Sequence, residues 1–348
     1  MIKEAIVKVS EGKNLTFDEA YEVVSEIMGG ETEQAQTAAF LTALHIKGET
    51  PDEISGAATA MREKALPVNH ESKVLEIVGT GGDKAQSMNV STTTAFLIAA
   101  AGVNVAKHGN RAATSKCGTA DALEALGGYL MVSPELNQKM IEENGFAFMF
   151  AQKYHSAMKY VGPVRKTIGI PTIFNLLGPL TNPAKPDYFL LGVYKEELVD
   201  EIAETLKKMG VKRAMVVFGQ DQLDEISVSA KTSVAELKED GSIERYEIDP
   251  ADFGITEKYT RDDIKGGEPK ENAALTREIL SGKAGQEGSK ANLAMKNVVL
   301  LNAAAALHLA KGVSLKEGFK EAEEVMNSGK ALEIIDKYVK MSNLEAQA

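Results

Sequence analysis

The stretch VLEIVGTGGDKAQSMNVSTTTAFLIAAA at residues 74–101 predicts the fold of this chain. Its first five residues form a short apolar run typical of a strand, GTGGD at 79–83 is rich in bare backbone, and residues 91–101 have the composition of a helix. A strand, a loop and a helix in this order direct free backbone N–H groups at the loop, where glycine lets an anion approach closely. We therefore expect an α/β fold with a phosphate-binding loop after this strand.

A second unit of the same kind follows in residues 103–126. An apolar run at 103–106 precedes KHGNR at 107–111, hydroxyl residues continue to Thr119, and a helix is expected over 119–126. Ligands of open α/β sheets bind at the carboxyl ends of the strands, which is where both loops fall. Lysine offers phosphate a point charge and arginine a planar fork. The loops together indicate two walls of one cleft for a highly charged phosphate ligand, although a solvated basic turn is the ordinary alternative for the second.

The rest of the chain repeats the alternation of strands and helices. Strands are expected at 146–150, 188–193 and 214–218, with a helix over 196–209 between the last two. This order predicts a mostly parallel sheet with right-handed crossovers. Residues 232–248 alternate as an antiparallel pair, and a helical tail begins near 271, with its most apolar and buried part at 297–309.

The first 70 residues read as helices. Thr16 has Glu19 three residues later, which is the spacing of a capping box, and Pro51 follows Thr50 at the first position of another helix. We expect an all-helical domain at 1–70, used for packing and oligomerisation, and a larger α/β domain at 71–348. The proline-rich segment from about 155 to 186 is ambiguous, and we expect it to cross back to the helical domain.

Composition excludes several classes of protein. The 348 residues carry a net charge of −11, which argues against a general nucleic-acid binder and against binding to anionic membranes, while leaving room for a local basic site. The single cysteine excludes an internal disulfide and a cysteine-built metal site. The amino terminus lacks the apolar core of a signal peptide. We expect a soluble cytoplasmic protein.

Three further features have both an ordinary and a functional interpretation. Residues NVST at 89–92 are either helix caps or, with the glycine loop, a diphosphate cradle in which the Ser91 hydroxyl binds Mg²⁺. Adjacent acids such as Asp224 and Glu225 are common on solvated loops, yet Mg²⁺ prefers carboxylates together with phosphate oxygens. Arg165 has apolar neighbours, which favours a half-buried position over a surface one. His155, in an apolar setting, is more typical of a structural residue.

At these residues the chain resembles the anthranilate phosphoribosyltransferase family. The resemblance spans most of the chain, in order and at similar spacing. Its matching segments are GTGGD (79–83), NVST (89–92), KHGNR (107–111), GTADALEALG (118–127), HSAMKYVGPVRK (155–166), TIFNLLGPLTNPA (172–184), LDEIS (223–227) and NVVLLNAAAALHLA (297–310).

The resemblance implies transfer of phosphoribose from 5-phosphoribosyl 1-diphosphate to anthranilate, a step of tryptophan biosynthesis, by a homodimer joined through its helical domain. The implied donor site is Gly79, Gly82, Asp83, Ser87, Asn89, Val90, Ser91, Thr92, Lys107, His108, Gly109, Asn110, Arg111, Ala112, Ala113, Thr114, Ser115 and Thr119. The implied anthranilate site is Gly79, His108, Asn110, His155, Arg165, Gly178 and Pro179. Ser91, Asp224 and Glu225 are the implied ligands of two Mg²⁺ ions per subunit. Lys107, Asp224 and Glu225 are the implied catalytic residues.

Five positions depart from the pattern of that family: Lys84 and Gln222 replace frequent glycines, Cys117 a frequent serine, and Gln152 and Ser156 prolines. Two other functions share the architecture. A pyrimidine nucleoside phosphorylase has a different basic loop, and a non-catalytic nucleic-acid-binding relative would be more basic or lack the second loop or the acidic pair. The acidic charge and the presence of both motifs favour the transferase.

Overall fold

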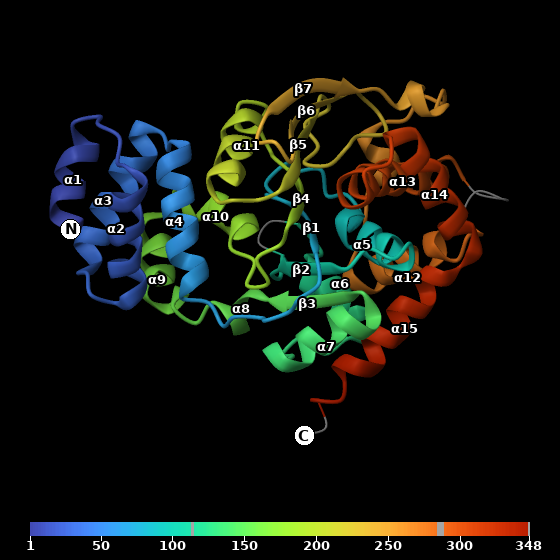
Figure 1. The fold of residues 1–348 in the computed structure, drawn as a ribbon, viewed down its shortest axis with the longest axis horizontal. Helices are drawn as coiled ribbons and strands as arrows, with labels where there is room; N and C mark the ends of the chain where they lie inside the picture. The colour runs from blue at the N-terminus through green and yellow to red at the C-terminus, as the bar shows by residue number, and fades with distance from the viewer. Residues whose placement is uncertain (113–114, 284–288, 347–348) are drawn as a thin grey trace.

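The computed structural model describes residues 1–112, 115–283 and 289–346. Two of the expected donor-site residues, Ala113 and Thr114, lie outside the described residues. Figure 1 shows a helical unit at the amino-terminal side of the molecule and a larger unit built on a twisted sheet beside it. This confirms the expected fold class, a small all-helical domain on a larger α/β domain.

The helical unit is stabilised by caps at its helix starts and by one buried apolar cluster. Thr16 accepts the N–H of Glu19 and Glu19 accepts the N–H of Thr16, as the sequence predicts, and Thr50 and Glu53 form the same box. The cluster joins the amino-terminal helices to two helices from the middle of the chain. These helices are α1 (Ile2–Ser10), α2 (Phe17–Gly29), α3 (Gln34–Lys47), α4 (Pro51–Glu63), α9 (Met158–Ile168) and α10 (Phe174–Leu180).

The segment that the sequence left ambiguous is helical. It follows α8 (Ala151–Tyr154) and forms α9 and α10, with Pro163 inside α9 and Pro179 inside α10. A proline inside a helix removes a hydrogen bond and costs about 3 kcal/mol, so local propensity argues against these helices. Burial of residues such as Val161 and Leu177 against α2, α3 and α4 outweighs that cost.

A seven-stranded sheet forms the centre of the larger unit, in the order β3-β2-β1-β4-β5-β6-β7. The first five strands are parallel and the last two antiparallel, which confirms both expectations. The strands are β1 (Leu75–Gly79), β2 (Val105–Gly109), β3 (Phe146–Phe150), β4 (Tyr188–Gly192), β5 (Arg213–Gly219), β6 (Thr232–Leu237) and β7 (Ile243–Ile248).

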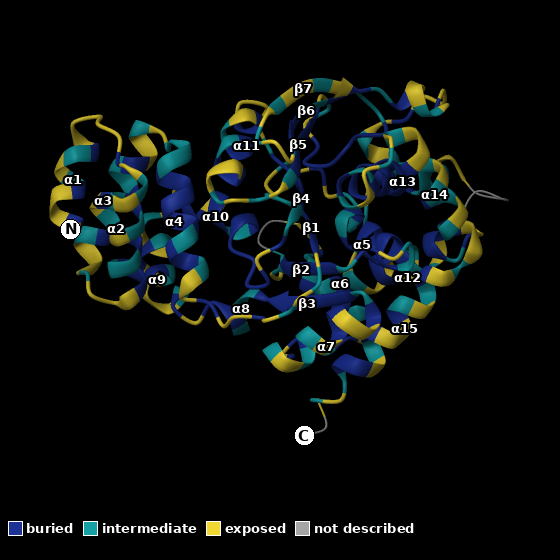
Figure 2. Cartoon of the chain, viewed as in Figure 1, coloured by how far each residue is buried: buried dark blue, intermediate teal, exposed yellow. Residues whose placement is uncertain are grey.

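Helices cover the sheet, and the long apolar helix α13 is largely buried (Figure 2). Within the described ranges, α13 is the one helix long and apolar enough to span a membrane, but 72% of its apolar window is buried inside the protein, so it is a core helix here. The covering helices are α5 (Val90–Ala100), α6 (Thr119–Ala125), α7 (Pro134–Asn144), α11 (Leu198–Lys208), η1 (Pro250–Phe253), η2 (Arg261–Ile264), α12 (Pro269–Leu280), α13 (Lys290–Lys311), α14 (Leu315–Ser328) and α15 (Lys330–Ser342).

Candidate active site

The candidate site lies at the carboxyl ends of β1, β2 and β4. From β1 the chain continues to β2 and β3 on one side, and β4 and β5 are added on the other side. Such a change of direction leaves a crevice beyond the strand ends, where ligands of open α/β sheets bind. The glycine loop follows β1 and the basic loop begins within β2, so the topology brings both to this crevice.

Asp224 lies directly over the ends of β1 and β4. Its Oδ2 accepts the N–H of Gly81 at 2.7 Å. A Cβ atom added to Gly79 would lie 2.3 Å from this same oxygen, and one added to Gly192 would lie 1.6 Å from the main-chain oxygen of Asp224. Both glycines are therefore required for the loop that carries Asp224 and Glu225, the acidic loop, to approach the glycine loop.

The carboxyls at this point have too little counter-charge, because Lys107 is the one cation that acts on Glu225 among the causes of its pKa shift. Asp224 and Glu225 are 8% and 7% exposed. Burial, then the charges of Asp83 and Glu225, raise the pKa of Asp224 well above its usual range. Burial raises the pKa of Glu225 to about 8, although Lys107 opposes the shift. A bound cation would relieve this shortage.

The donor atoms fit Mg²⁺. Asp83 Oδ2 is buried and lacks a hydrogen-bond partner among the described residues, and the backbone of Ser91 approaches Glu225. Carboxylate and hydroxyl oxygens suit this hard cation. No group of three His, Cys, Asp or Glu side chains in the described part of the chain is arranged to hold a metal by itself. Water and substrate oxygens would complete the shell, as is usual for Mg²⁺.

Lys107 lies beneath the site. It is 1% exposed, and its Nζ donates to the Ile77 carbonyl at 2.5 Å and to Ser91 Oγ at 3.2 Å. Burial lowers the pKa of Lys107, while Glu76 and Glu225 raise it. The side chain is thus a buried cation under the start of α5. The alternative interpretation, a solvated basic turn, is wrong for this residue.

Asn89 follows the glycine loop and connects it to two other segments of the chain. Its Nδ2 donates to the Cys117 carbonyl at 3.1 Å, and its Oδ1 accepts from Asn272 Nδ2 at 2.9 Å and from Cys117 Sγ at 3.2 Å. Within the described residues its side chain forms no cap on α5, so the cap interpretation is wrong for Asn89. The next residues, Val90 to Thr92, begin α5.

The second loop is held mainly by its own helix. Arg111 donates to Asp121 at 2.9 Å and to Glu124 at 2.8 and 3.0 Å, so its guanidinium is tied to α6 rather than turned to the acidic pair. Asp121 also accepts the N–H groups of Ala112 and Gly118. Asn110 Oδ1 accepts from its neighbour's N–H and from the side chain of Gln152 at 3.2 Å.

The remaining residues that the sequence predicts around the basic loop support this loop or lie at its surface. A Cβ on Gly109 would lie 3.2 Å from Thr119, which shows how closely the loop packs on α6. Ser115 is exposed, with its hydroxyl 3.4 Å from the Cys117 carbonyl, and Ser87 pairs with Lys265 in a β-bridge.

Two buried histidines lie beside α10. The rings of His108 and His155 are 4.9 Å apart in an edge-on arrangement, and His108 Nδ1 lies 3.2 Å from the Gly178 carbonyl, next to Pro179. Burial lowers the pKa of His108 to about 3, and of His155 to about 4, so both rings are neutral near pH 7. Three of their four nitrogens are buried and have no hydrogen-bond partner of good geometry among the described residues.

Arg165 is half-buried, as the sequence predicts. Its Nη2 donates to Asn175 Oδ1 at 3.2 Å, and its guanidinium carbon lies 5.4 Å from the centre of the Phe174 ring. Burial lowers the pKa of this arginine. Among the described residues no carboxylate pairs with it, so an acidic ligand would supply its counter-charge.

Several residues of the site have weak or no sequence signals. Glu76 Oε2 accepts the N–H of His108 and the amide of Asn182, and burial raises the pKa of Glu76 to about 8. A charged residue within the apolar run VLEIV is the one hint of this role. Arg261 and Asn272 come from distant segments and have no local signal.

The structure shows why glycine is frequent in the family at two of the departing positions. Lys84 has φ +56° and Gln222 has φ +67°, in the left-handed region that favours glycine. Glycine at these positions would fit the backbone without the strain that a Cβ brings.

The fold and the site define a transferase of the glycosyl transferase family. Its helical bundle domain model matches residues 3–65 and its a/b domain model matches residues 71–332. The chain is 51% identical to an anthranilate phosphoribosyltransferase of Methanobrevibacter smithii, over 99% of this chain and 100% of that protein.

Solved structures agree with this. The anthranilate phosphoribosyltransferase of Thermus thermophilus has a TM-score of 0.89 and 42% identity, covering 97% of this chain and 99% of that one. The Saccharomyces cerevisiae enzyme, in complex with PRPP and Mg, has a TM-score of 0.88 and 29% identity, covering 98% of each chain. The chain belongs to the anthranilate phosphoribosyltransferase family.

Proposed function

We propose that the protein transfers the phosphoribosyl group of 5-phosphoribosyl 1-diphosphate to the amino group of anthranilate, with release of diphosphate, in tryptophan biosynthesis. The observation that carries this proposal is the meeting of Asp83, Asp224 and Glu225 with the glycine loop over buried Lys107. These acids have too little counter-charge to serve structure alone, and a magnesium-bound diphosphate supplies it.

The donor is held by both loops and by the start of α5. Ser91, Asp224 and Glu225 would hold Mg²⁺, with two ions per subunit, and the metal would neutralise charge on the diphosphate. Gly79, Gly82, Ser87 and Thr92 line the approach of the phosphates. Lys107 contributes a fixed positive charge from below Ser91, where burial strengthens its effect on charge that develops at the leaving oxygen.

The acceptor lies between α9, α10 and the basic loop. Arg165 pairs with the anthranilate carboxylate and turns the amine toward the sugar C1, with Asn110, His108 and His155 along the same path. The amine nitrogen forms a bond to C1 as the bond from C1 to the diphosphate oxygen breaks, and the proton that the amine then loses passes to water. An aromatic amine is already neutral near pH 7, so no residue is required to activate it as a base.

The proposal is tested by the fluorescence of anthranilate. Anthranilate should be consumed when 5-phosphoribosyl 1-diphosphate and Mg²⁺ are both present, and not when either is omitted. Phosphorolysis of thymidine or uridine by the same preparation, without consumption of anthranilate, would overturn it in favour of a nucleoside phosphorylase.

We also propose that the chain forms a cytoplasmic homodimer through its helical unit. Val7 on α1 is 56% exposed and Ile46 on α3 is 79% exposed, and α1 and α3 pack together. Exposed apolar side chains on neighbouring helices favour a partner surface. Analytical ultracentrifugation should give twice the chain mass, and Val7→Glu with Ile46→Glu should give the monomer.

A further inference from the structure

Arg261, at the start of η2, connects the two acidic parts of the site. One nitrogen of its guanidinium donates to the main-chain carbonyl of Asp83 at 2.9 Å, and the other donates to the carbonyl of Asp221 at 2.9 Å. Asp83 belongs to the glycine loop, and Asp221 begins the turn that carries Asp224 and Glu225. One half-buried side chain therefore bridges two loops that are far apart in the sequence.

The residues after Arg261 continue along the same loop. The Met88 N–H donates to the Ile264 carbonyl and the Gly266 N–H donates to the Gln86 carbonyl, both at 2.9 Å, and Ser87 pairs with Lys265. Residues 261–266, which we name the clasp, thus hold the loop over 83–88 from end to end.

The loop needs this external support. Gly81 and Gly82 have φ of +70° and +86°, and Lys84 and Gln86 have φ of +56° and +51°. Left-handed backbone costs about 1–2 kcal/mol for each residue with a Cβ, so the loop conformation is not favoured by its own sequence. The carboxyls of Asp83, Asp224 and Glu225 also repel one another, which opposes the approach of the two loops.

We propose that Arg261 is a positioning residue that holds the glycine loop and the acidic loop at the spacing needed for Mg²⁺ and the sugar diphosphate before either binds. This inference rests on the proposed function of the site. Arg261 acts through two backbone carbonyls and does not touch the reacting atoms. A preformed site binds more tightly because the ordering cost has already been met, so Arg261 contributes to donor affinity rather than to acceptor affinity.

The guanidinium is required for its shape. Its planar fork reaches two carbonyls at once, whereas an ammonium on a flexible chain offers no fixed pair of donors. Arg261→Lys therefore keeps the charge and removes the bridge, and Arg261→Gln removes both. Arg277→Gln is the matched control, since Arg277 on α12 forms an exposed pair with Asp336 on α15 and lies outside the clasp.

The experiment measures binding rather than turnover. Titration calorimetry of 5-phosphoribosyl 1-diphosphate in saturating Mg²⁺, without anthranilate, should show about tenfold weaker binding for Arg261→Gln, with Arg261→Lys between it and the wild type. Amide hydrogen exchange over residues 80–88 in the metal-free protein should become faster in both variants. Anthranilate affinity and the Arg277→Gln variant should be unchanged.

Three outcomes would overturn the proposal. Donor affinity and loop exchange equal to the wild type would remove the positioning role. An equal loss of donor and acceptor affinity, or unfolding of both Arg261 variants, would make the residue a general support of the fold. If the wild-type protein itself bound no sugar diphosphate, the proposed function would fail, and the faster loop exchange expected of the variants would still test the clasp separately.

Discussion

Two regions of this molecule bury carboxylates, and they shift the pKa of these groups in opposite directions. Over the ends of β1 and β4, the pKa of Glu225 is raised to about 8 by burial. Between β6, β7 and the α13–α14 corner, a cavity of about 440 Å³ contains Glu236, which is 1% exposed. Hydrogen bonds from His308, Lys238 and Tyr246 overcome burial and lower the pKa of Glu236 to about 2.

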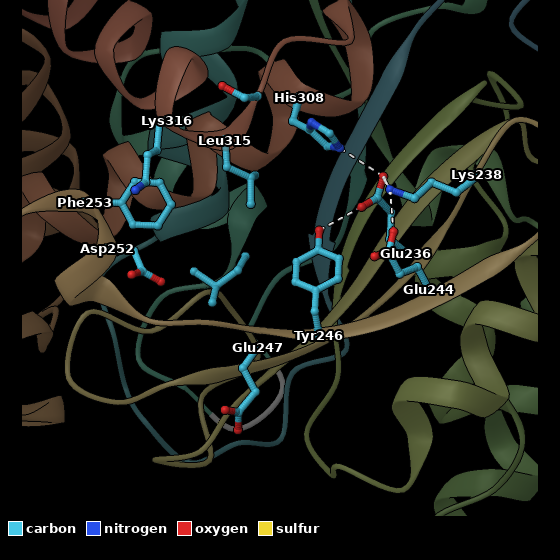
Figure 3. A pocket seen from close by; sticks show the side chains of 12 residues that line it. Glu236, Lys238, Glu244, Tyr246, Glu247, Asp252, Phe253, His308, Leu315 and Lys316 are labelled. Atoms are coloured by element: carbon cyan, nitrogen blue, oxygen red, sulfur yellow. Dashed lines mark hydrogen bonds and ion pairs between the residues drawn. The ribbon is translucent and has the colours of Figure 1, made fainter.

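Figure 3 shows how the second region is satisfied: His308 and Lys238 converge on one oxygen of Glu236, at 2.9 and 2.8 Å, and the Tyr246 hydroxyl donates to the other at 2.8 Å. Arg213 lies beside them and donates to the last carbonyls of α13. Similar burial therefore has two meanings. The charge and hydrogen bonds of Glu236 are satisfied by groups that connect β6 to α13. The acids at the strand ends are neutralised only when a cation binds.

The largest expected effect comes from removing the acids that lack partners. Asp224→Ala with Glu225→Ala should lower kcat/KM by about 10²–10³-fold and change the Mg²⁺ dependence, because the charge that holds the metal is gone. Steady-state kinetics across an Mg²⁺ titration measure this. Glu247→Ala, at an exposed pair with Lys231, is the control. An unchanged Mg²⁺ titration would exclude these residues as metal ligands.

The sharpest test of the comparison is a pair of isosteric changes with opposite signs. Glu236→Gln should destabilise the protein by about 2 kcal/mol, since it leaves the partly buried Lys238 and Arg213 without their anion. Glu225→Gln should stabilise the metal-free protein by about 1 kcal/mol above pH 7. A raised pKa means that the folded state resists the ionisation that the unfolded state undergoes freely, and the amide removes this cost. Urea unfolding in the presence of a chelator measures the free energy of unfolding of both variants. If both were less stable than the wild type, the proposed difference between Glu225 and Glu236 would be wrong.

Arg165, a half-buried cation with no acidic partner among the described residues, extends the comparison to the acceptor side. Arg165→Ala should raise the KM for anthranilate by about tenfold to a hundredfold and leave that for the donor unchanged, because a charge-assisted hydrogen bond is lost. Lys166→Ala, at the exposed neighbouring position, is the control. A change confined to the donor KM would show that the assignment of Arg165 is wrong.

The last expected effect is a slope in the dependence of stability on pH. The pKa values of His108 and His155 lie near 3 and 4 through burial, and the charge of Lys107 also disfavours a cationic His108. Below pH 6.5 the unfolded chain takes up protons that the folded chain does not, so stability is lost as pH falls, by about 1.4 kcal/mol per pH unit for each histidine. His155→Gln should flatten the slope between pH 6.5 and 4 in urea unfolding. Exposed His45→Gln is the control, and an equal slope in all three proteins would contradict a buried neutral pair.

Local patterns were sufficient for the sheet and for parts of the site. Thr16 and Glu19 form the expected capping box, and the apolar runs ending in GTGGD and KHGNR are parallel neighbours. Parallel strands place their carboxyl ends at one edge, which is why sequence reasoning could connect the glycine loop with Asp224. It could not find α9 and α10, where tertiary burial overrides internal prolines, nor the pairing of Arg111 with Glu124.

The sequence by itself determined the order of the strands, the amino-terminal helices, the chemical types at the strand ends and the likeness to one family. These depend on residues close together in the chain, where periodicity, caps and glycines act directly. The tertiary structure alone decided which carboxylates are short of counter-charge, which are satisfied, and that Arg261 bridges the two acidic loops. Such properties depend on desolvation and on the distances between groups from remote segments, which no local pattern contains.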